Sequence, residues 1–127
     1  MKRRRAGRTG LVLSELGLGC SSYWAKPVFP EKDALALVEA AIASEITFFD
    51  TGASYAAGNA ERRLGLALHN HRGNRNLVVA TKAGTHVSPS GRYYKDWSRA
   101  AITASVARSL ERLGIPAIDI LHLHGPD

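Results

Sequence analysis

The sequence predicts an α/β fold in which short parallel strands alternate with amphipathic helices. Apolar runs without polar alternation, typical of strands buried on both faces, begin near residues 16, 46, 77 and 118. Their spacing of roughly 30 to 40 residues is the length of one strand with its crossover helix. A barrel of eight such units takes about 250 residues. We therefore expect residues 1–127 to form the N-terminal half of a single (β/α)8 TIM barrel domain, with about four units after an N-terminal hairpin.

The first unit is expected to follow that hairpin. Arg8-Thr9-Gly10-Leu11 has the composition of a tight turn, in which Gly10 can adopt a positive φ. The first barrel strand is predicted over Leu16 to Gly19, and Pro30 with Glu31 opens the first helix. One face of that helix carries apolar residues at helical spacing: Leu35, Val38 and Ile42.

The second unit starts with the β-branched and aromatic run Ile46 to Phe49, which ends at Asp50. Asn59 is expected to cap the helix that follows, with Glu61 near the positive end of the helix dipole. Leu64 and Leu68 form its apolar stripe.

The third strand is predicted over Leu77 to Thr81 and ends at Lys82. The segment from Ala83 to Trp97 is interpreted as a long loop with a binding role. Ser98 caps the third helix, and Gly114 followed by Pro116 ends it. The helix carries the strongest apolar stripe of the chain: Ile102, Val106, Leu110 and Leu113. Ile118 to Leu123 is the fourth strand.

Composition excludes several classes of protein. The net charge is +6, but the basic residues are scattered without the interleaved aromatics that stack nucleic-acid bases, so no nucleic-acid partner is expected. No apolar run reaches the roughly 20 residues of a membrane span, and the basic start leads into polar sequence, unlike a signal peptide. The single cysteine, Cys20, fits a reducing compartment. A cytoplasmic protein without a membrane partner is expected.

Four residues of different chemistry end the predicted strands or directly follow them. They are Asp50, Tyr55, Lys82 and His124. The C-terminal strand ends of such a barrel form its catalytic face, so these side chains should share one pocket. Tyrosine, with an ordinary pKa of about 10, is a weak acid near neutrality, and a lysine ammonium in hydrogen-bonding reach makes it a better proton donor.

These four residues predict protonation of a carbonyl oxygen. Asp50 would keep Lys82 charged and oriented, and His124 could bind the oxygen that Tyr55 protonates. The set contains no thiol, activated serine or group of metal ligands that could supply a nucleophile. Hydride is therefore the natural candidate for the group that attacks the carbonyl carbon. Hydride transfer requires a nicotinamide cofactor, because no side chain supplies hydride.

The whole chain resembles the aldo-keto reductase family. The motifs that carry the resemblance are Gly10-Leu11, Leu16-Gly17-Leu18-Gly19, Phe49-Asp50-Thr51-Gly52-Ala53-Ser54-Tyr55, Ala60-Glu61, Leu64-Gly65, Thr81-Lys82, Ser109-Leu110-Glu111-Arg112-Leu113 and Leu123-His124-Gly125-Pro126-Asp127. The resemblance implies the catalytic tetrad Asp50, Tyr55, Lys82 and His124, with Tyr55 as proton donor. It also implies NADP(H), or NAD(H), bound without a Rossmann fold. Gly52 replaces a usual alanine of the family.

The resemblance also implies the first cofactor contacts and the class of substrate. The candidate cofactor-binding residues are Gly19, Cys20, Ser21 and Asp50. The substrate would be a small carbonyl compound or a sugar, and the loop aromatics that could wall its pocket are Trp24, Tyr93, Tyr94 and Trp97. Substrate identity, reaction direction and oligomeric state are left open.

Three other interpretations stay open. His122 and His124 share a strand face and could bind zinc, but Lys82 would place a repelling charge near the metal, so no metal site is expected. Tyr55-Ala56-Ala57-Gly58 is similar to potassium-channel β subunits, which bind cofactor as regulatory subunits and typically carry asparagine in place of His124. The third is a truncated fragment that is inactive in isolation and shows no saturable NADPH fluorescence change.

Overall fold

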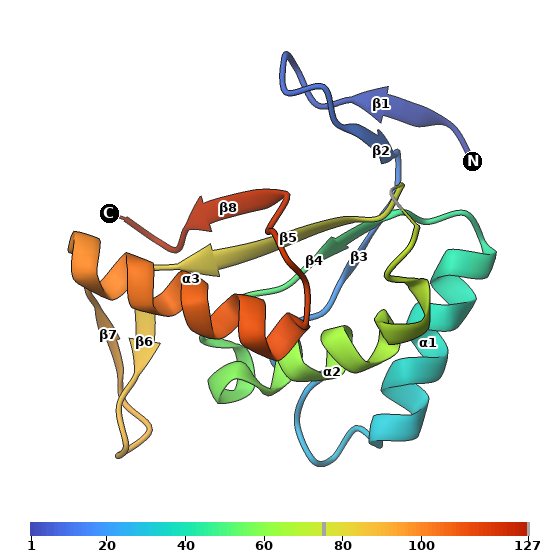
Figure 1. Cartoon of the computed structure of the whole chain (residues 1–127). Coiled ribbons are helices and arrows are strands. Elements are labelled where there is room, and N and C mark those ends of the chain that lie inside the picture. The colour runs from blue at the N-terminus through green and yellow to red at the C-terminus, as the bar shows by residue number, and fades with distance from the viewer. Residues whose placement is uncertain (75, 127) are drawn as a thin grey trace.

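A four-stranded parallel sheet forms the centre of the structure, a computed structural model that describes residues 1–74 and 76–126 (Figure 1). Arg75 and Asp127, the last residue of the Leu123-His124-Gly125-Pro126-Asp127 motif, lie outside the described residues. In sheet order the strands are β3 (Gly17–Gly19), β4 (Phe48–Asp50), β5 (Val78–Ala83) and β8 (Ile120–Leu123). The predicted strands are confirmed, with ends that shift by up to two residues.

The strand register brings the predicted functional residues to one edge of the sheet. Gly19 lies opposite Asp50 across β3 and β4, and Lys82 lies opposite His122 across β5 and β8. Because all four strands are parallel, their C-terminal ends meet at the same edge.

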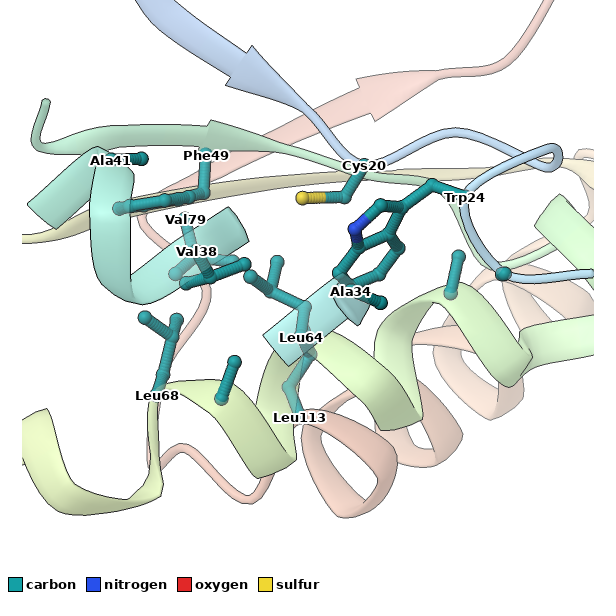
Figure 2. Close-up of a cluster of buried hydrophobic side chains, with 13 residues drawn as sticks. Cys20, Trp24, Ala34, Val38, Ala41, Phe49, Leu64, Leu68, Val79 and Leu113 are labelled. Carbon is teal, nitrogen blue, oxygen red and sulfur yellow. The ribbon is translucent and has the colours of Figure 1, made fainter. Parts of the chain in front are cut away.

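Three helices of the described part lie together on one side of the sheet (Figure 1). They are α1 (Glu31–Ala43), α2 (Asn59–Ala67) and α3 (Arg99–Leu113). The buried core lies between the helices and the sheet, where Figure 2 shows Val38 of α1, Leu64 of α2 and Phe49 of β4 converging. Three strand–helix units and the strand of a fourth are thus present, as the α/β barrel pattern predicts.

Helix α3 departs in part from its predicted stripe. Ser98 caps it through a hydrogen bond from the Ala101 backbone N–H, and Gly114 ends it with φ of 63°, both as predicted. The fully buried positions, however, are Ser105, Ser109 and Leu113, whereas the other stripe residues are only half-buried. Close packing explains the C-terminal end of this face, where a Cβ added at Gly65 of α2 would lie 2.5 Å from the Arg112 carbonyl oxygen and 2.6 Å from that of Leu113.

Two hairpins flank the sheet. At the N-terminus, β1 (Arg3–Arg5) pairs with β2 (Val12–Ser14) as predicted, and Gly10 in the connection has φ of 83°. Reciprocal hydrogen bonds between Ser14 and Thr47 join this hairpin to the start of β4.

The second hairpin corrects the prediction of a loop over Ala83 to Trp97. Strand β6 (Thr85–Val87) pairs with β7 (Tyr93–Lys95), and Gly91 adopts φ of 81° in the turn between them. This hairpin extends from the C-terminal end of β5, beside α3 (Figure 1).

Two further predictions are wrong. Asn59 is the first residue of α2 rather than its cap, which is Gly58, and the Asn59 side chain instead donates to the Ala25 carbonyl oxygen at 2.6 Å. Trp24 does not wall a substrate pocket, because its indole is 5% exposed and lies in the core beside Cys20 (Figure 2). In both cases the loop between β3 and α1 folds back over α2, a tertiary contact that local sequence does not reveal.

Candidate active site

The four predicted site residues gather at the C-terminal edge of the sheet. Asp50 is the last residue of β4, and Lys82 is the penultimate residue of β5. Tyr55 opens the 3-10 helix η1 (Tyr55–Gly58), which follows β4 directly, and His124 comes just after β8. Neighbouring parallel strands therefore bring together residues up to 74 positions apart in the chain.

Lys82 and Asp50 form an ion pair at the floor of this site. The Lys82 Nζ donates to Asp50 Oδ2 at 2.6 Å and to the Thr51 carbonyl oxygen at 2.6 Å. The lysine side chain is 16% exposed and the aspartate side chain 36%. Two acceptors on the β4 end thus hold the ammonium in a fixed place.

Tyr55 and His124 complete the arrangement above that pair. The Lys82 Nζ lies 5.0 Å from the centre of the Tyr55 ring, so lysine and tyrosine are on the same side of the sheet. The Tyr55 and His124 rings meet edge to face, with centroids 5.5 Å apart. Among the described residues, Lys82 makes no hydrogen bond to the Tyr55 hydroxyl, so the contact is one of cation and ring.

The surroundings of His124 favour its neutral imidazole form. Burial lowers its pKa below the ordinary value, and the nearby charges of Lys82 and Lys95 lower it further, against an opposing effect of Asp50. Its Nδ1 lies 3.3 Å from the Ser54 hydroxyl oxygen. If that hydroxyl donates to Nδ1, the proton of the ring resides on Nε2, which can then donate to a ligand.

Backbone strain is concentrated beside Tyr55. Ala56 and Ala57 adopt left-handed conformations, with φ of 49° and 54°, and Gly58 follows with φ of 91°. Non-glycine residues in this region cost about 1 kcal/mol or more each. Gly52 contributes differently, since a Cβ added there would lie 3.1 Å from the Tyr55 ring. The replacement of the usual alanine therefore leaves room for that ring.

A buried ionic network supports the site from below. The Glu61 side chain is fully buried and accepts from Thr81 Oγ1 at 2.7 Å and from Arg112 at 3.1 Å. It thus joins α2 to α3 and to the residue before Lys82. Sequence reasoning placed Glu61 at the helix dipole and missed this network, although its spacing from Leu64 and Leu68 sets it on the apolar face.

The predicted cofactor-binding residues differ in accessibility. Gly19 and Ser21 are exposed at the end of β3. The Cys20 side chain is instead turned into the core (Figure 2), where burial, with a smaller effect of Asp50, raises its pKa to about 12. Its backbone N–H donates to the Asp50 carbonyl oxygen at 2.7 Å. Cys20 therefore offers a ligand no thiol.

His122 is exposed on β8. Within residues 1–74 and 76–126, no group of three or more metal-ligating side chains is arranged to hold a metal ion. The helices in the same ranges are all too short or too polar to cross a membrane.

The sequence of this chain matches a known protein family. The sequence model of the aldo/keto reductase family matches residues 15–127. The uncharacterized oxidoreductase YqkF of Bacillus subtilis is 36% identical over 126 residues, which cover 98% of this chain and 39% of that protein. A D-threo-aldose 1-dehydrogenase of a Pseudomonas species is 32% identical over 142 residues, with coverage of 96% and 43%.

A solved structure extends the similarity to the fold. The aldo-keto reductase AKR11C1 of Bacillus halodurans, in its holo form, is 33% identical and matches with a TM-score of 0.85. The match covers 100% of this chain and 41% of that structure. The chain therefore spans about two fifths of the length of these relatives.

Proposed function

Because the chain belongs to the aldo/keto reductase family of oxidoreductases, we propose that Asp50, Tyr55, Lys82 and His124 are the catalytic tetrad of an NADP(H)-dependent carbonyl reductase. The reaction reduces an aldehyde or ketone to an alcohol, or runs in reverse on an aldose. The observation that carries the proposal is the Lys82–Asp50 pair held 5.0 Å from the centre of the Tyr55 ring, with His124 edge-on to the same ring.

Each residue has one role in this proposal. Tyr55 donates its hydroxyl proton to the carbonyl oxygen of the substrate, and the Lys82 ammonium favours the phenolate that remains. Asp50 keeps Lys82 in place. His124 is neutral and donates from Nε2 to the same carbonyl oxygen, which orients the substrate.

The exposed end of β3 fits a flat cofactor ring. Gly19 lies beside Asp50 and has open space on its side-chain face, since an added Cβ would meet no atom within 4 Å. Gly19, Ser21, the Asp50 carboxylate and the backbone of Cys20 would hold the nicotinamide end of the cofactor. The nicotinamide supplies the hydride, with NADP(H) proposed and NAD(H) possible.

The proposed substrate is a small aldehyde or an aldose. The D-threo-aldose 1-dehydrogenase among the relatives supports a sugar. The exposed aromatics of the hairpin, Tyr93, Tyr94 and Trp97, support it further, because aromatic faces pack against sugar rings.

A chimaera tests the function. Residues 1–127 are joined to the remainder of the Bacillus subtilis relative, and NADPH oxidation is followed with a panel of aldehydes and aldoses. We expect turnover that Tyr55→Phe lowers by about a hundredfold or more, with NADPH binding unchanged, because the variant removes only the proton donor. Tyr23→Phe is the control, since Tyr23 is exposed and packs on Phe29. Equal turnover in the Tyr55→Phe chimaera would contradict the assignment, and cofactor binding without turnover of any aldehyde or aldose would favour a regulatory subunit.

A further inference from the structure

A cavity of about 210 Å³ lies beyond the tetrad, between α3 and the β6–β7 hairpin. Three segments line it: the Ala53–Ser54 turn, the hairpin through His86 and Tyr94, and α3 through Ser105, Arg108 and Arg112. None of the described residues that line it is acidic. The tetrad residues do not line it either, so the cavity is separate from the four proposed catalytic side chains, although it shares Tyr94 with the proposed substrate site.

The cavity carries uncompensated positive charge. Arg108 and Arg112 are one helical turn apart and face the same space. Arg112 is paired with the buried Glu61 at 3.1 Å, whereas Arg108 forms no ion pair with any described residue. The Arg108 guanidinium is therefore available to bind an anion.

Hydroxyl-bearing side chains that line the cavity can also donate hydrogen bonds. Ser54, Tyr94 and Ser105, each of which carries a hydroxyl group, line the cavity, and Ser105 is only 2% exposed. The His86 ring stacks on Tyr94 with centroids 5.2 Å apart, and its Nε2 lies 3.2 Å from the Asp96 carbonyl oxygen. This contact orients His86 at the mouth of the cavity.

We propose that this cavity binds a phosphate-sized oxyanion, either inorganic phosphate or the phosphate group of a monoester. Arginine is a donor without acceptor capacity, and two guanidinium groups with hydroxyl donors match the several acceptor oxygens of phosphate. The volume holds several water molecules at about 30 Å³ each, which a phosphate group would replace. The proposal is independent of the catalytic assignment.

An anion bound in the cavity would affect the tetrad residue His124 through Ser54. Ser54 lines the cavity, and its hydroxyl oxygen lies 3.3 Å from His124 Nδ1. A hydroxyl has one proton, so a Ser54 that donates to an anion cannot donate to His124. Phosphate binding should therefore disturb the His124 resonances as well as those of His86.

Calorimetric titration of the 127-residue chain tests the site, with inorganic phosphate, glycerol 3-phosphate and acetate at equal ionic strength. We expect saturable phosphate binding with a dissociation constant of about 1 mM or below, and none with acetate. Arg108→Gln should weaken it about tenfold or more, because a charge-assisted hydrogen bond is lost. Arg99→Gln is the matched control, since Arg99 is exposed on the same helix outside the cavity and should leave binding unchanged.

Histidine NMR locates the ligand. The His86 and His124 resonances should move with phosphate along the same saturation curve, whereas those of the exposed His69 should not. Tighter binding of glycerol 3-phosphate identifies a monoester as the ligand, and equal or weaker binding identifies free phosphate. Absence of saturable phosphate binding, or an equal loss in Arg99→Gln and Arg108→Gln, overturns the proposal.

Discussion

The Lys82 ammonium lies 2.6 Å from Asp50 Oδ2 and 5.0 Å from the centre of the Tyr55 ring, so one cation joins the strand β4 carboxylate to the proposed proton donor. Asp50→Asn removes the charge that holds this cation, although the Thr51 carbonyl oxygen remains as an acceptor. We expect kcat of the chimaera to fall about tenfold or more, since a charge-assisted hydrogen bond contributes about 1.5–3 kcal/mol. Steady-state NADPH oxidation measures kcat of the variant and of the parent chimaera.

The control for this variant is Asp33→Asn. Asp33 is exposed in the first turn of α1, so its loss of charge should leave kcat unchanged. A similar kcat in the Asp50→Asn chimaera and the parent would show that Lys82 does not depend on Asp50.

Glu61 is the proposed structural anchor of the site. Glu61→Gln leaves Arg112 without its carboxylate and weakens the contact to Thr81, so we expect the free energy of unfolding to fall by about 3 kcal/mol. Urea unfolding followed by circular dichroism measures the change. Glu39→Gln, which removes an exposed contact to His71, should cost less than about 1 kcal/mol. Equal losses in the two variants would mean that the buried network contributes no more than a surface pair.

Because α2 and α3 pack closely at Gly65, replacement of this glycine by alanine should destabilise the fold. A Cβ at Gly65 would lie 2.5 Å from the Arg112 carbonyl oxygen and 2.6 Å from that of Leu113. Gly65→Ala should therefore destabilise the fold by about 1–3 kcal/mol, although helix propensity alone favours alanine by about 1 kcal/mol. Gly73→Ala is the control because an added Cβ there has open space. A more stable Gly65→Ala variant in thermal unfolding would show that the helices can separate at little cost.

The meeting of the four candidate residues at one edge of the sheet could be predicted from the sequence because strand ends are a local signal. Asp50 and Lys82 end short apolar runs, and parallel strands bring such ends to one edge whatever the details of packing. The hairpin over residues 85–95 was missed for a different reason. Tyr93 and Tyr94 are good strand formers, but their side chains are exposed, so no buried face produces an alternating pattern.

Contacts between distant elements could not be predicted. Periodicity selects the large apolar residues of α3, whereas Ser105 and Ser109 share the buried face with Leu113, which lies beside Gly65 of α2. Glu61 stands at the spacing of a core residue, and only the position of Arg112, 51 residues away, explains how its charge is accommodated. Local sequence therefore determines which residues reach the site, and tertiary packing determines what supports them.

Cys20 should be an inert thiol. Burial raises its pKa from 9.0 to about 12, so the reactive thiolate is about a thousandfold scarcer at neutral pH than in an ordinary cysteine. We expect the folded chain to react with a disulfide reagent at pH 8 far more slowly than the chain unfolded in guanidinium. Absorbance of the released thiolate measures both rates. Comparable rates would show that the cysteine side chain is open to solvent.

His124 should make the stability of the fold depend on pH. Its pKa is lowered from 6.5 in the folded chain, chiefly by burial, so the unfolded chain binds the additional proton more readily. The contribution of His124 is therefore fully present above pH 6.5 and is lost as pH falls through the lower folded value. An NMR titration should give a midpoint for His124 below 6.5. Between that midpoint and pH 6.5, urea unfolding should show less pH dependence in His124→Gln than in the parent. His69→Gln, on the exposed surface, should retain the parent's dependence. A His124 midpoint at or above the ordinary value would mean that neither burial nor the charges of Lys82 and Lys95 act on the ring, and the neutral donor proposed at Nε2 would have to be abandoned.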